Sequence, residues 1–240
     1  MENKRKNCIA ISILNVENID TFLNEICKIR TKINKELKTN FDIVIHFDVM
    51  DGKFVKNNGV YLPYIKKVKE NGLFADVHLM VEEPIKDKYI DNAIAYGADN
   101  VIIHYEISNF KNALYYLNEK KESIKKDKDI FVGVAIKPDT NIDVLNDFKN
   151  DFDNILVMSV EPGYGGQSYI TSTNDKLKEI IKVFKDKYIE IDGGVNIDTI
   201  KIPLKYSVNG FVIGSYITNN QRLDVMFDKI KSIIKLKEQA

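Results

Sequence analysis

The most informative segment of this chain is Ile45-His46-Phe47-Asp48-Val49-Met50-Asp51-Gly52, a short apolar run that ends in an Asp-Gly turn. The run predicts a β-strand, in which residues two apart project to the same side. We therefore expect His46 and Asp48 to leave the strand end side by side. A ring nitrogen and a carboxylate placed in this way can bind a divalent metal, and the carboxylate can also exchange a proton with a substrate.

Short apolar runs alternate with longer amphipathic segments from one end of the chain to the other. The apolar runs are rich in β-branched and aliphatic residues and predict buried strands at 9–14, 43–47, 74–80, 100–104, 130–136, 154–159, 188–191 and 210–213. The segments between them predict helices at 19–37, 61–69, 85–96, 110–120, 142–146, 174–184, 198–206 and 223–236. Residues 120–129 are predicted to form a charge-rich loop.

Eight strand–helix units in 240 residues indicate a (β/α)8 barrel, the TIM barrel, for which about 250 residues is typical. We predict a single catalytic domain over residues 1–240. The alternative is a doubly wound open sheet, which requires a Gly-x-Gly-x-x-Gly turn after its first strand. Leu14-Asn15-Val16-Glu17 offers no such turn. In the barrel, the carboxyl ends of all strands converge on one mouth.

The composition excludes several classes of function. Lys plus Arg and Asp plus Glu balance at 35 each, so we expect no nucleic-acid partner and no anionic membrane partner. Cys8 and Cys27 form neither a disulfide framework nor a metal-type spacing, which favours a reducing, cytoplasmic location. The N-terminal apolar segment is interrupted by Ser12 and predicts no secretory signal, and no stretch approaches a membrane span.

Further candidate metal ligands lie at the ends of other predicted strands. Asp76-Val77-His78 repeats the two-residue spacing on the next strand, so His78 can reach the same metal as His46 and Asp48. Asp192 closes the seventh strand and is expected to face them across the mouth. Two histidines and two carboxylates suit Zn²⁺, Mn²⁺ or Fe²⁺ better than Mg²⁺ or Ca²⁺.

Other residues near the mouth have open or structural assignments. Asp76 lies one layer deeper, where it either orients a metal ligand or is a hydrogen-bonded core carboxylate. Asp51 is assigned to the turn, because strand parity directs it away from Asp48. The third histidine, His104, also ends a strand and receives no role. Methionines end three strands, where they either pack in the core or form a polarizable, water-poor wall around the reacting atoms: Met50, Met80 and Met158.

Glycine-rich loops follow the last three predicted strands. They are Glu161-Pro162-Gly163-Tyr164-Gly165-Gly166-Gln167, Asp192-Gly193-Gly194 and Gly214-Ser215. Glycine lets the backbone approach a ligand closely and turn its amide groups toward an anion. In a barrel, these last loops are where a phosphate commonly binds, so we predict a phosphate site that needs no Lys or Arg.

Four motifs resemble those of the ribulose-phosphate 3-epimerase family, in order and over nearly the whole chain, from Ile9 to about Ile217. They are His46-Phe-Asp-Val-Met-Asp-Gly52, Asp76-Val-His-Leu-Met-Val81, Met158-Ser-Val-Glu-Pro-Gly-Tyr-Gly-Gly-Gln167 and Asp192-Gly-Gly-Val-Asn196. The resemblance implies a metal-dependent barrel of the ribulose-phosphate-binding type. It implies interconversion of D-ribulose 5-phosphate and D-xylulose 5-phosphate, a reaction of the pentose phosphate pathway.

The resemblance also implies roles for individual residues. Asp48 and Asp192 would be the acid–base pair and, with His46 and His78, would hold one divalent ion per subunit, with zinc expected and iron, manganese or cobalt as alternatives. The remaining residues would contact the substrate or surround its phosphate, together with His78 and Asp192: Ser12, Gly163, Tyr164, Gly165, Gly166, Gly193, Gly194, Gly214 and Ser215. A homo-oligomer is expected.

Some positions depart from the family pattern. Lys56 replaces an expected proline, Asn58-Gly59-Val60-Tyr61 replaces a glycine-rich continuation, and Ile11 stands where proline is usual. The first strand–helix unit is lengthened between Ile29 and Asn40. These changes flank the mouth, so they bear on substrate selection and oligomer contacts rather than on the chemistry.

The expected reaction is proton transfer by two carboxylates at carbon 3 through an enediolate. An epimerase for allulose 6-phosphate or another phosphoketose remains an alternative. A related phosphosugar decarboxylase would need Asp-x-Lys-x-x-Asp, and residues 46–51 lack the lysine. A non-catalytic sugar-phosphate sensor predicts the loss of at least one ligand or proton carrier, and none is missing.

Overall fold

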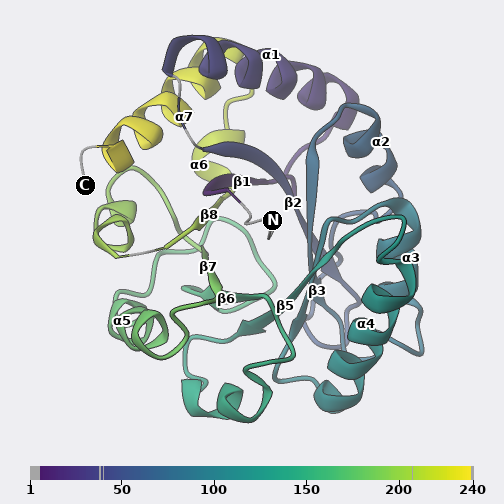
Figure 1. Cartoon of the computed structure of the whole chain (residues 1–240). Coiled ribbons are helices and arrows are strands. Elements are labelled where there is room, and N and C mark those ends of the chain that lie inside the picture. The colour runs from purple at the N-terminus through teal and green to yellow at the C-terminus, as the bar shows by residue number, and fades with distance from the viewer. Residues whose placement is uncertain (1–5, 38, 40, 207, 239–240) are drawn as a thin grey trace.

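Eight parallel strands close into one barrel in a computed structural model that describes residues 6–37, 39, 41–206 and 208–238. The strands follow one another around the ring in chain order, and helices surround them (Figure 1). Their bounds are β1 Cys8–Ser12, β2 Asp42–Met50, β3 Phe74–Met80, β4 Asn100–His104, β5 Phe131–Ile136, β6 Asn154–Met158, β7 Tyr188–Asp192 and β8 Gly210–Ile213. The predicted (β/α)8 barrel is thus confirmed.

The strand prediction differs from the structure mainly at β1 and β2. β1 ends at Ser12 rather than at residue 14, and β2 extends to Met50 rather than ending at residue 47. Asp48 therefore lies within the strand instead of directly after it. It is paired with His78 of β3, whereas the pairing of β2 with β1 ends at His46.

The helices that cover the barrel are of very unequal length. They are α1 Ile19–Leu37, α2 Tyr64–Glu70, α3 Tyr89–Tyr96, α4 Phe110–Ile124, α5 Thr173–Val183, α6 Ser215–Thr218 and α7 Leu223–Glu238. Residues Ile142–Phe148, Thr199–Lys201 and Pro203–Lys205 form 3-10 turns. In the described part of the chain, no helix is long and apolar enough to cross a bilayer.

Several predicted helices were wrong in extent or type. α2 begins at Tyr64, directly after Pro63, and α3 begins only at Tyr89. The predicted helix over 198–206 is two 3-10 turns divided before Pro203, because proline has no amide hydrogen to continue a helix. α4 extends to Ile124, so the predicted loop over 120–129 is helical at its start.

Alternation along the strands separates an outer core from a polar barrel interior. Ile45, Phe47 and Val49 of β2 are buried among the residues that pack between strands and helices. The intervening positions of β2 and β3 face the barrel axis and carry His46, Asp48, Asp76 and His78, all buried. Below them, small and branched apolar side chains fill the barrel, among them Ala10, Val44, Ile102, Leu156 and Val212.

The pairing of β2 with β3 crosses the two polar motifs. In this parallel ladder His46 is paired with Asp76, and Asp48 is paired with His78. The order His-x-Asp on one strand therefore meets Asp-x-His on the other. Each histidine has a carboxylate as its lateral neighbour.

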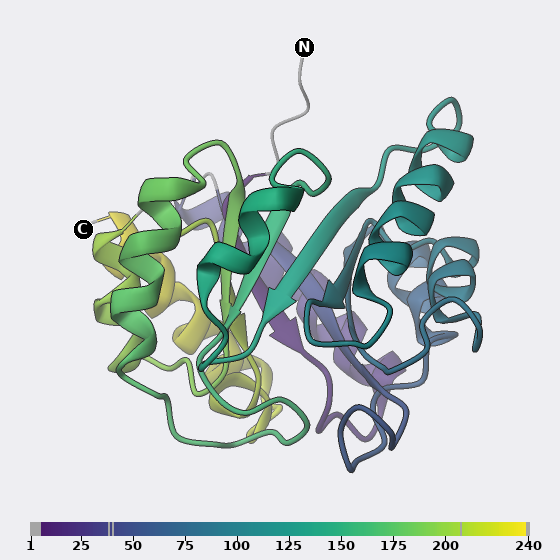
Figure 2. The same cartoon turned by 90° about the horizontal axis from the view of Figure 1, so that it is seen from below.

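Two long loops meet at the carboxyl end of the barrel, at the bottom of Figure 2. They connect β2 to α2 and β6 to α5. The Asn57 side chain donates a hydrogen bond to the Gly163 carbonyl at 2.8 Å, and the Tyr164 hydroxyl donates to the Lys56 carbonyl at 3.0 Å. These loops therefore lie against each other over part of the mouth, and Lys56, a position that departs from the family pattern, contributes through its backbone.

Candidate active site

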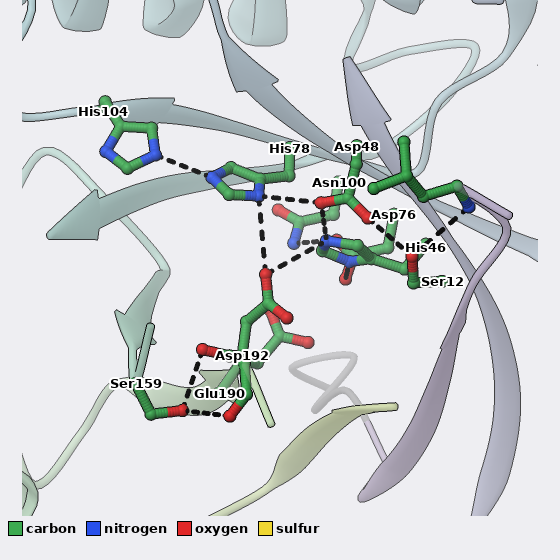
Figure 3. A network of polar contacts seen from close by, with 12 residues as sticks. Ser12, His46, Asp48, Asp76, His78, Asn100, His104, Ser159, Glu190 and Asp192 are labelled. Carbon is green, nitrogen blue, oxygen red and sulfur yellow. Dashed lines mark hydrogen bonds and ion pairs between the residues drawn. The ribbon is translucent and has the colours of Figure 1, made fainter. Parts of the chain in front are cut away.

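Four side chains from three strands converge at the centre of the mouth (Figure 3). His46 and Asp48 come from β2, His78 from β3 and Asp192 from the end of β7. His46 Nε2 lies 3.6 Å from Asp48 Oδ1 and 4.0 Å from Asp192 Oδ2. His78 Nδ1 lies 3.4 Å and 3.7 Å from the same two oxygens. One atom from each residue falls within 4.8 Å of all the others, so the four atoms surround a common point.

The chemistry of this donor set fits a divalent cation. Neither His46 Nε2 nor His78 Nδ1 has a hydrogen-bond partner among the described residues, although both atoms are buried. Buried polar atoms without partners are costly, and a ligand for them removes that cost. In a tetrahedral zinc site with bonds of about 2.0–2.1 Å, neighbouring ligand atoms lie about 3.4 Å apart. The nitrogen–oxygen separations of 3.4 to 4.0 Å need only small adjustment to reach that value.

The ring of His46 is oriented by Asp76 from the neighbouring strand. His46 Nδ1 lies 3.1 Å from Asp76 Oδ2, and Asp76 Oδ1 accepts a hydrogen bond of 2.6 Å from the Asn100 side chain. Two roles were left open for Asp76, orienting a metal ligand and forming a hydrogen-bonded core carboxylate. Its contacts with His46 and Asn100 fit both roles. With Nδ1 occupied, His46 directs Nε2 to the common point.

The ring of His78 has a different partner, which the sequence did not reveal. His78 Nε2 lies 2.8 Å from His104 Nε2, and His104 Nδ1 lies 2.9 Å from Glu106 Oε2. His104 and His78 are both fully buried. Glu106 follows His104 at the same two-residue spacing as His46 and Asp48, and this signal, which the sequence analysis did not use, could have found it.

The two aspartates respond in opposite directions to their surroundings. Burial raises the pKa of Asp48, but the adjoining His46 and His78 rings outweigh this and hold that pKa well below its usual range. Burial and the negative charge of Asp48 raise the pKa of Asp192 to about 7. Burial lowers the pKa of His78 to about 4, which keeps that ring neutral and able to bind a cation. Two carboxylates with separated pKa values are suited to different steps of proton transfer.

Most predicted substrate residues line one cavity at the mouth. Ser12 is part of its wall and donates a hydrogen bond of 2.6 Å to Asp48 Oδ2, which leaves Oδ1 directed toward the histidines. His46 and His78 lie beneath the cavity rather than in its wall. The other predicted residues that line it are Asp48, Asp192, Gly163, Tyr164, Gly165, Gly166, Gly193, Gly194, Gly214, Ser215, Met50, Met80 and Met158.

The glycines after β7 occupy positions that few other residues could take. Gly193 and Gly194 have φ values of +117° and +62°. A Cβ atom on Gly194 would lie 2.5 Å from the Tyr169 backbone nitrogen, and one on Gly193 would lie 2.4 Å from the Val160 side chain. The Ser159 hydroxyl donates to the carbonyls of Asp192 and Gly193 at 2.9 and 2.7 Å, which fixes this turn beside the cavity. The loop is therefore narrow and held in place.

Asp51 and several wall residues complete the mouth. Asp51 lies in the turn, as predicted, where Oδ1 accepts from the backbone N–H groups of Lys53 and Phe54, each at 2.9 Å. Its Oδ2 accepts from the Glu82 N–H at 2.8 Å, which ties the β2 and β3 loops together. Sequence reasoning assigned no function to other residues of the cavity wall, including Leu14, Asn15, Gln167, Val195 and Thr218.

Comparison with known proteins identifies close sequence relatives. The model of the ribulose-phosphate 3 epimerase family matches residues 9–218. A ribulose-phosphate 3-epimerase from Bacillus subtilis is 37% identical over 177 residues, which cover 71% of this chain and 77% of that protein. One from Schizosaccharomyces pombe is 31% identical over 223 residues, covering 89% and 92%.

Solved structures share the fold at low sequence identity. KGPDC from Streptococcus mutans superposes with a TM-score of 0.66 at 13% identity, covering 98% of this chain and 99% of that one. 3-Hexulose-6-phosphate synthase from Salmonella typhimurium also gives a TM-score of 0.66, at 16% identity, covering 97% and 99%. These two likenesses concern the barrel alone.

Proposed function

This chain belongs to the ribulose-phosphate 3-epimerase family and is an epimerase, and on that premise we propose that it interconverts D-ribulose 5-phosphate and D-xylulose 5-phosphate. The observation that carries the proposal is the meeting of Asp48 and Asp192 at one point. Their strands, β2 and β7, lie three steps apart in the ring of eight. Inversion of a carbon beside a carbonyl requires proton transfer on both faces, and two carboxylates that reach the site from different sides supply it.

His46, Asp48, His78 and Asp192 would hold one divalent cation per subunit, with zinc as the expected metal and iron, manganese or cobalt as alternatives. When bound, the cation supplies positive charge that stabilises the negative charge developing on the substrate oxygens. The two unpartnered ring nitrogens support this assignment.

The protein's own residues position the substrate and move the protons. One aspartate removes the proton from carbon 3 and the other returns a proton to the opposite face. Ser12 holds Asp48 in place through its hydrogen bond. The backbone of residues 193–194 and 214–215 would bind the phosphate, and Gly163, Tyr164, Gly165 and Gly166 would border it. Met50, Met80 and Met158, which line the cavity, would exclude water from the reacting atoms.

We propose a cytoplasmic location and a homo-oligomeric state for the enzyme. Cys8 and Cys27 are free thiols, which suits the reducing cytoplasm. A homo-oligomer is expected from the family resemblance, and the exposed Tyr61 side chain, at 65%, is the contact that we propose for it. Light scattering after gel filtration measures the oligomeric state.

The decisive experiment measures epimerisation and deuterium incorporation at carbon 3 in heavy water, with the protein loaded with zinc. The unaltered enzyme should convert both pentulose phosphates and label each at carbon 3. Asp48→Asn and Asp192→Asn should each reduce epimerisation by about 10²- to 10⁴-fold, the usual contribution of an acid–base group. Each variant should still label the one epimer whose proton faces the remaining aspartate.

Two controls accompany this experiment. Zinc content is measured for each variant, because both aspartates are also proposed ligands. D-allulose 6-phosphate is assayed in parallel, since faster turnover of that ketose would replace the pentose assignment. Near-normal epimerisation by either zinc-loaded variant would remove that aspartate from the acid–base role.

A further inference from the structure

We propose that Glu106 and His104 are positioning residues that fix the ring tautomer of His78, so that His78 Nδ1 faces the metal without a proton. The inference rests on the metal site proposed above and extends it to residues outside that site. It follows from one chain of hydrogen bonds, which runs from the loop after β4 to the centre of the mouth; Figure 3 shows its inner part, from His104 to His78.

The chain begins at the Glu106 carboxylate, which can only accept hydrogen bonds when ionised. Oε1 accepts from the Lys137 N–H at 2.7 Å and from the Thr140 hydroxyl. Burial raises the pKa of Glu106, but the contacts with His104, Lys137 and Thr140 prevail and lower it to about 2. The proton in the 2.9 Å contact with Glu106 Oε2 therefore belongs to His104 Nδ1.

The next step follows from the chemistry of a neutral imidazole, which carries one proton. His78 can bind a cation only as the neutral ring, and we assign the neutral form to His104 as well, which is fully buried between His78 and Glu106. Since His104 Nδ1 holds its proton, His104 Nε2 can only accept. His78 Nε2, 2.8 Å away, must then donate, and the lone pair of His78 lies on Nδ1. That atom is the one directed at Asp48 and Asp192.

In the part of the chain that the structure describes, His104 is the hydrogen-bond partner of His78 Nε2. His104 is fully buried, and the Phe54 ring covers it with a centroid separation of 4.7 Å. The Lys137 ammonium in turn lies 4.7 Å from the centroid of the Phe54 ring. The two histidine rings are therefore sheltered from water, and solvent cannot supply a hydrogen bond that would stabilise the wrong tautomer.

His46 provides an internal comparison. It reaches Asp76 directly through Nδ1 and presents Nε2 to the common point, so the two histidines use opposite nitrogens. A carboxylate beside the ring fixes His46 in one step. His78 needs two steps, because a second imidazole lies between it and the carboxylate of Glu106.

Glu106→Gln should exchange donors and acceptors along this series of hydrogen bonds without changing which residues are in contact. Two donors, the Lys137 N–H and the Thr140 hydroxyl, require the amide oxygen to take the Oε1 position. The amide NH₂ group then faces His104 Nδ1 and makes that atom an acceptor. The His104 proton moves to Nε2, and the His78 proton moves to Nδ1, where it competes with the metal.

The test determines imidazole tautomers from ¹⁵N–¹H correlation spectra of metal-free protein, and zinc affinity by competition with a chelating indicator. In the unaltered protein, protons should occupy His46 Nδ1, His78 Nε2 and His104 Nδ1. In Glu106→Gln the protons of His78 and His104 should change nitrogen, and zinc affinity should fall by about 10- to 100-fold, as for other partners of metal ligands. The His46 signals should not change, because its Nδ1 contacts Asp76 rather than this chain of hydrogen bonds.

Glu82→Gln is the matched control, because Glu82 accepts from Ser108 at the end of the neighbouring strand and touches no imidazole. It should leave all three tautomers and the zinc affinity unchanged. Unaltered tautomers and affinity in Glu106→Gln would overturn the proposal. A proton on His104 Nε2 in the unaltered protein would also overturn the proposal. This second result does not require the variant to fold. Failure of the unaltered protein to bind zinc would instead contradict the proposed metal site, while the metal-free spectra still test the hydrogen-bond chain.

Discussion

The two sides of the barrel mouth differ in which part of the chain forms them. On the side of β2 and β3, side chains face the centre, and His46 and His78 are completely buried. On the side of β6 to β8, glycine backbone borders the cavity, and the Tyr164 side chain is 58% exposed. The side chains of the first side lie on paired strands, whereas the second side depends on contacts between loops.

This difference separates two tasks. Metal binding and proton transfer need side-chain atoms held to within a fraction of an ångström, which paired strands provide. Binding a phosphate needs several amide groups turned toward one point, which glycine loops provide. Asp192 joins the two sides, because its side chain reaches the histidines while its backbone begins the glycine turn.

Removing the metal should produce the largest effect and should separate the two sides. Treatment with a chelator should lower kcat by more than 100-fold, beyond the roughly 10- to 100-fold cost of losing an outer partner, and zinc should restore it. Inorganic phosphate, measured by calorimetry, should bind the metal-free protein with nearly unchanged affinity. Loss of phosphate binding with the metal would show that the sides are not independent.

Gly194→Ala should act on the loop side alone. Gly194 and Gly52 have φ values of +62° and +72°, but only at Gly194 would a Cβ meet backbone, 2.5 Å from the Tyr169 nitrogen. Gly52→Ala should lose about 1–2 kcal/mol of unfolding free energy, the cost of a left-handed residue, and Gly194→Ala should lose more, because its Cβ also collides with backbone. Only Gly194→Ala should raise KM, by about tenfold or more, since one charge-assisted hydrogen bond is worth about 1.5–3 kcal/mol. Equal KM values in the two variants would contradict a phosphate site at this turn.

Asp192→Asn should stabilise the metal-free protein in a pH-dependent way. In the folded chain the pKa of Asp192 is raised from 3.8 to about 7, so folding retains a proton that the unfolded chain loses. Stability of the metal-free protein should therefore fall as pH rises from 4 to 7, and the full penalty should remain above 7. At pH 8 the variant should melt a few degrees higher than the unaltered protein, and near pH 4 the difference should vanish. A variant that melts lower at pH 8 would contradict the charge repulsion inferred here.

Tyr164→Phe should give the smallest effect. It removes the 3.0 Å hydrogen bond to the Lys56 carbonyl, one of the ties between the two mouth loops. Because this contact is exposed, its net value lies near the lower end of about 0.5–1.5 kcal/mol. KM should rise by less than about threefold, and kcat should not change. A large change in kcat would show that the loops also control the strand side.

Sequence reasoning worked best on the side where the strands carry the chemistry. The two-residue spacings of His46 with Asp48 and of Asp76 with His78 placed these side chains on one face, because strand geometry has a fixed period. The convergence of Asp192 followed from the barrel topology. These inferences needed only local geometry and the order of strands.

Some features were missed for different reasons. Glu106 follows His104 at the spacing of His46 and Asp48, but it lies beyond the end of β4, where strand geometry no longer fixes the direction of a side chain. The 3-10 turns around Pro203 and the short α6 were missed because amphipathic spacing does not distinguish a helix from a succession of tight turns. The length of β2 was underestimated because Asp48, a polar residue, lies inside the barrel rather than beyond the strand.

The crossed pairing of β2 with β3 limits which arrangements of the barrel can bind a cation. Sliding β3 by two residues would oppose His46 to His78 in one direction, or Asp48 to Asp76 in the other, and the set of four donors would be lost. Since metal binding contributes free energy only to the arrangement that assembles its ligands, it favours the native register over these neighbours. The ion would thus help the chain to select one alignment as the barrel closes, before any substrate is present.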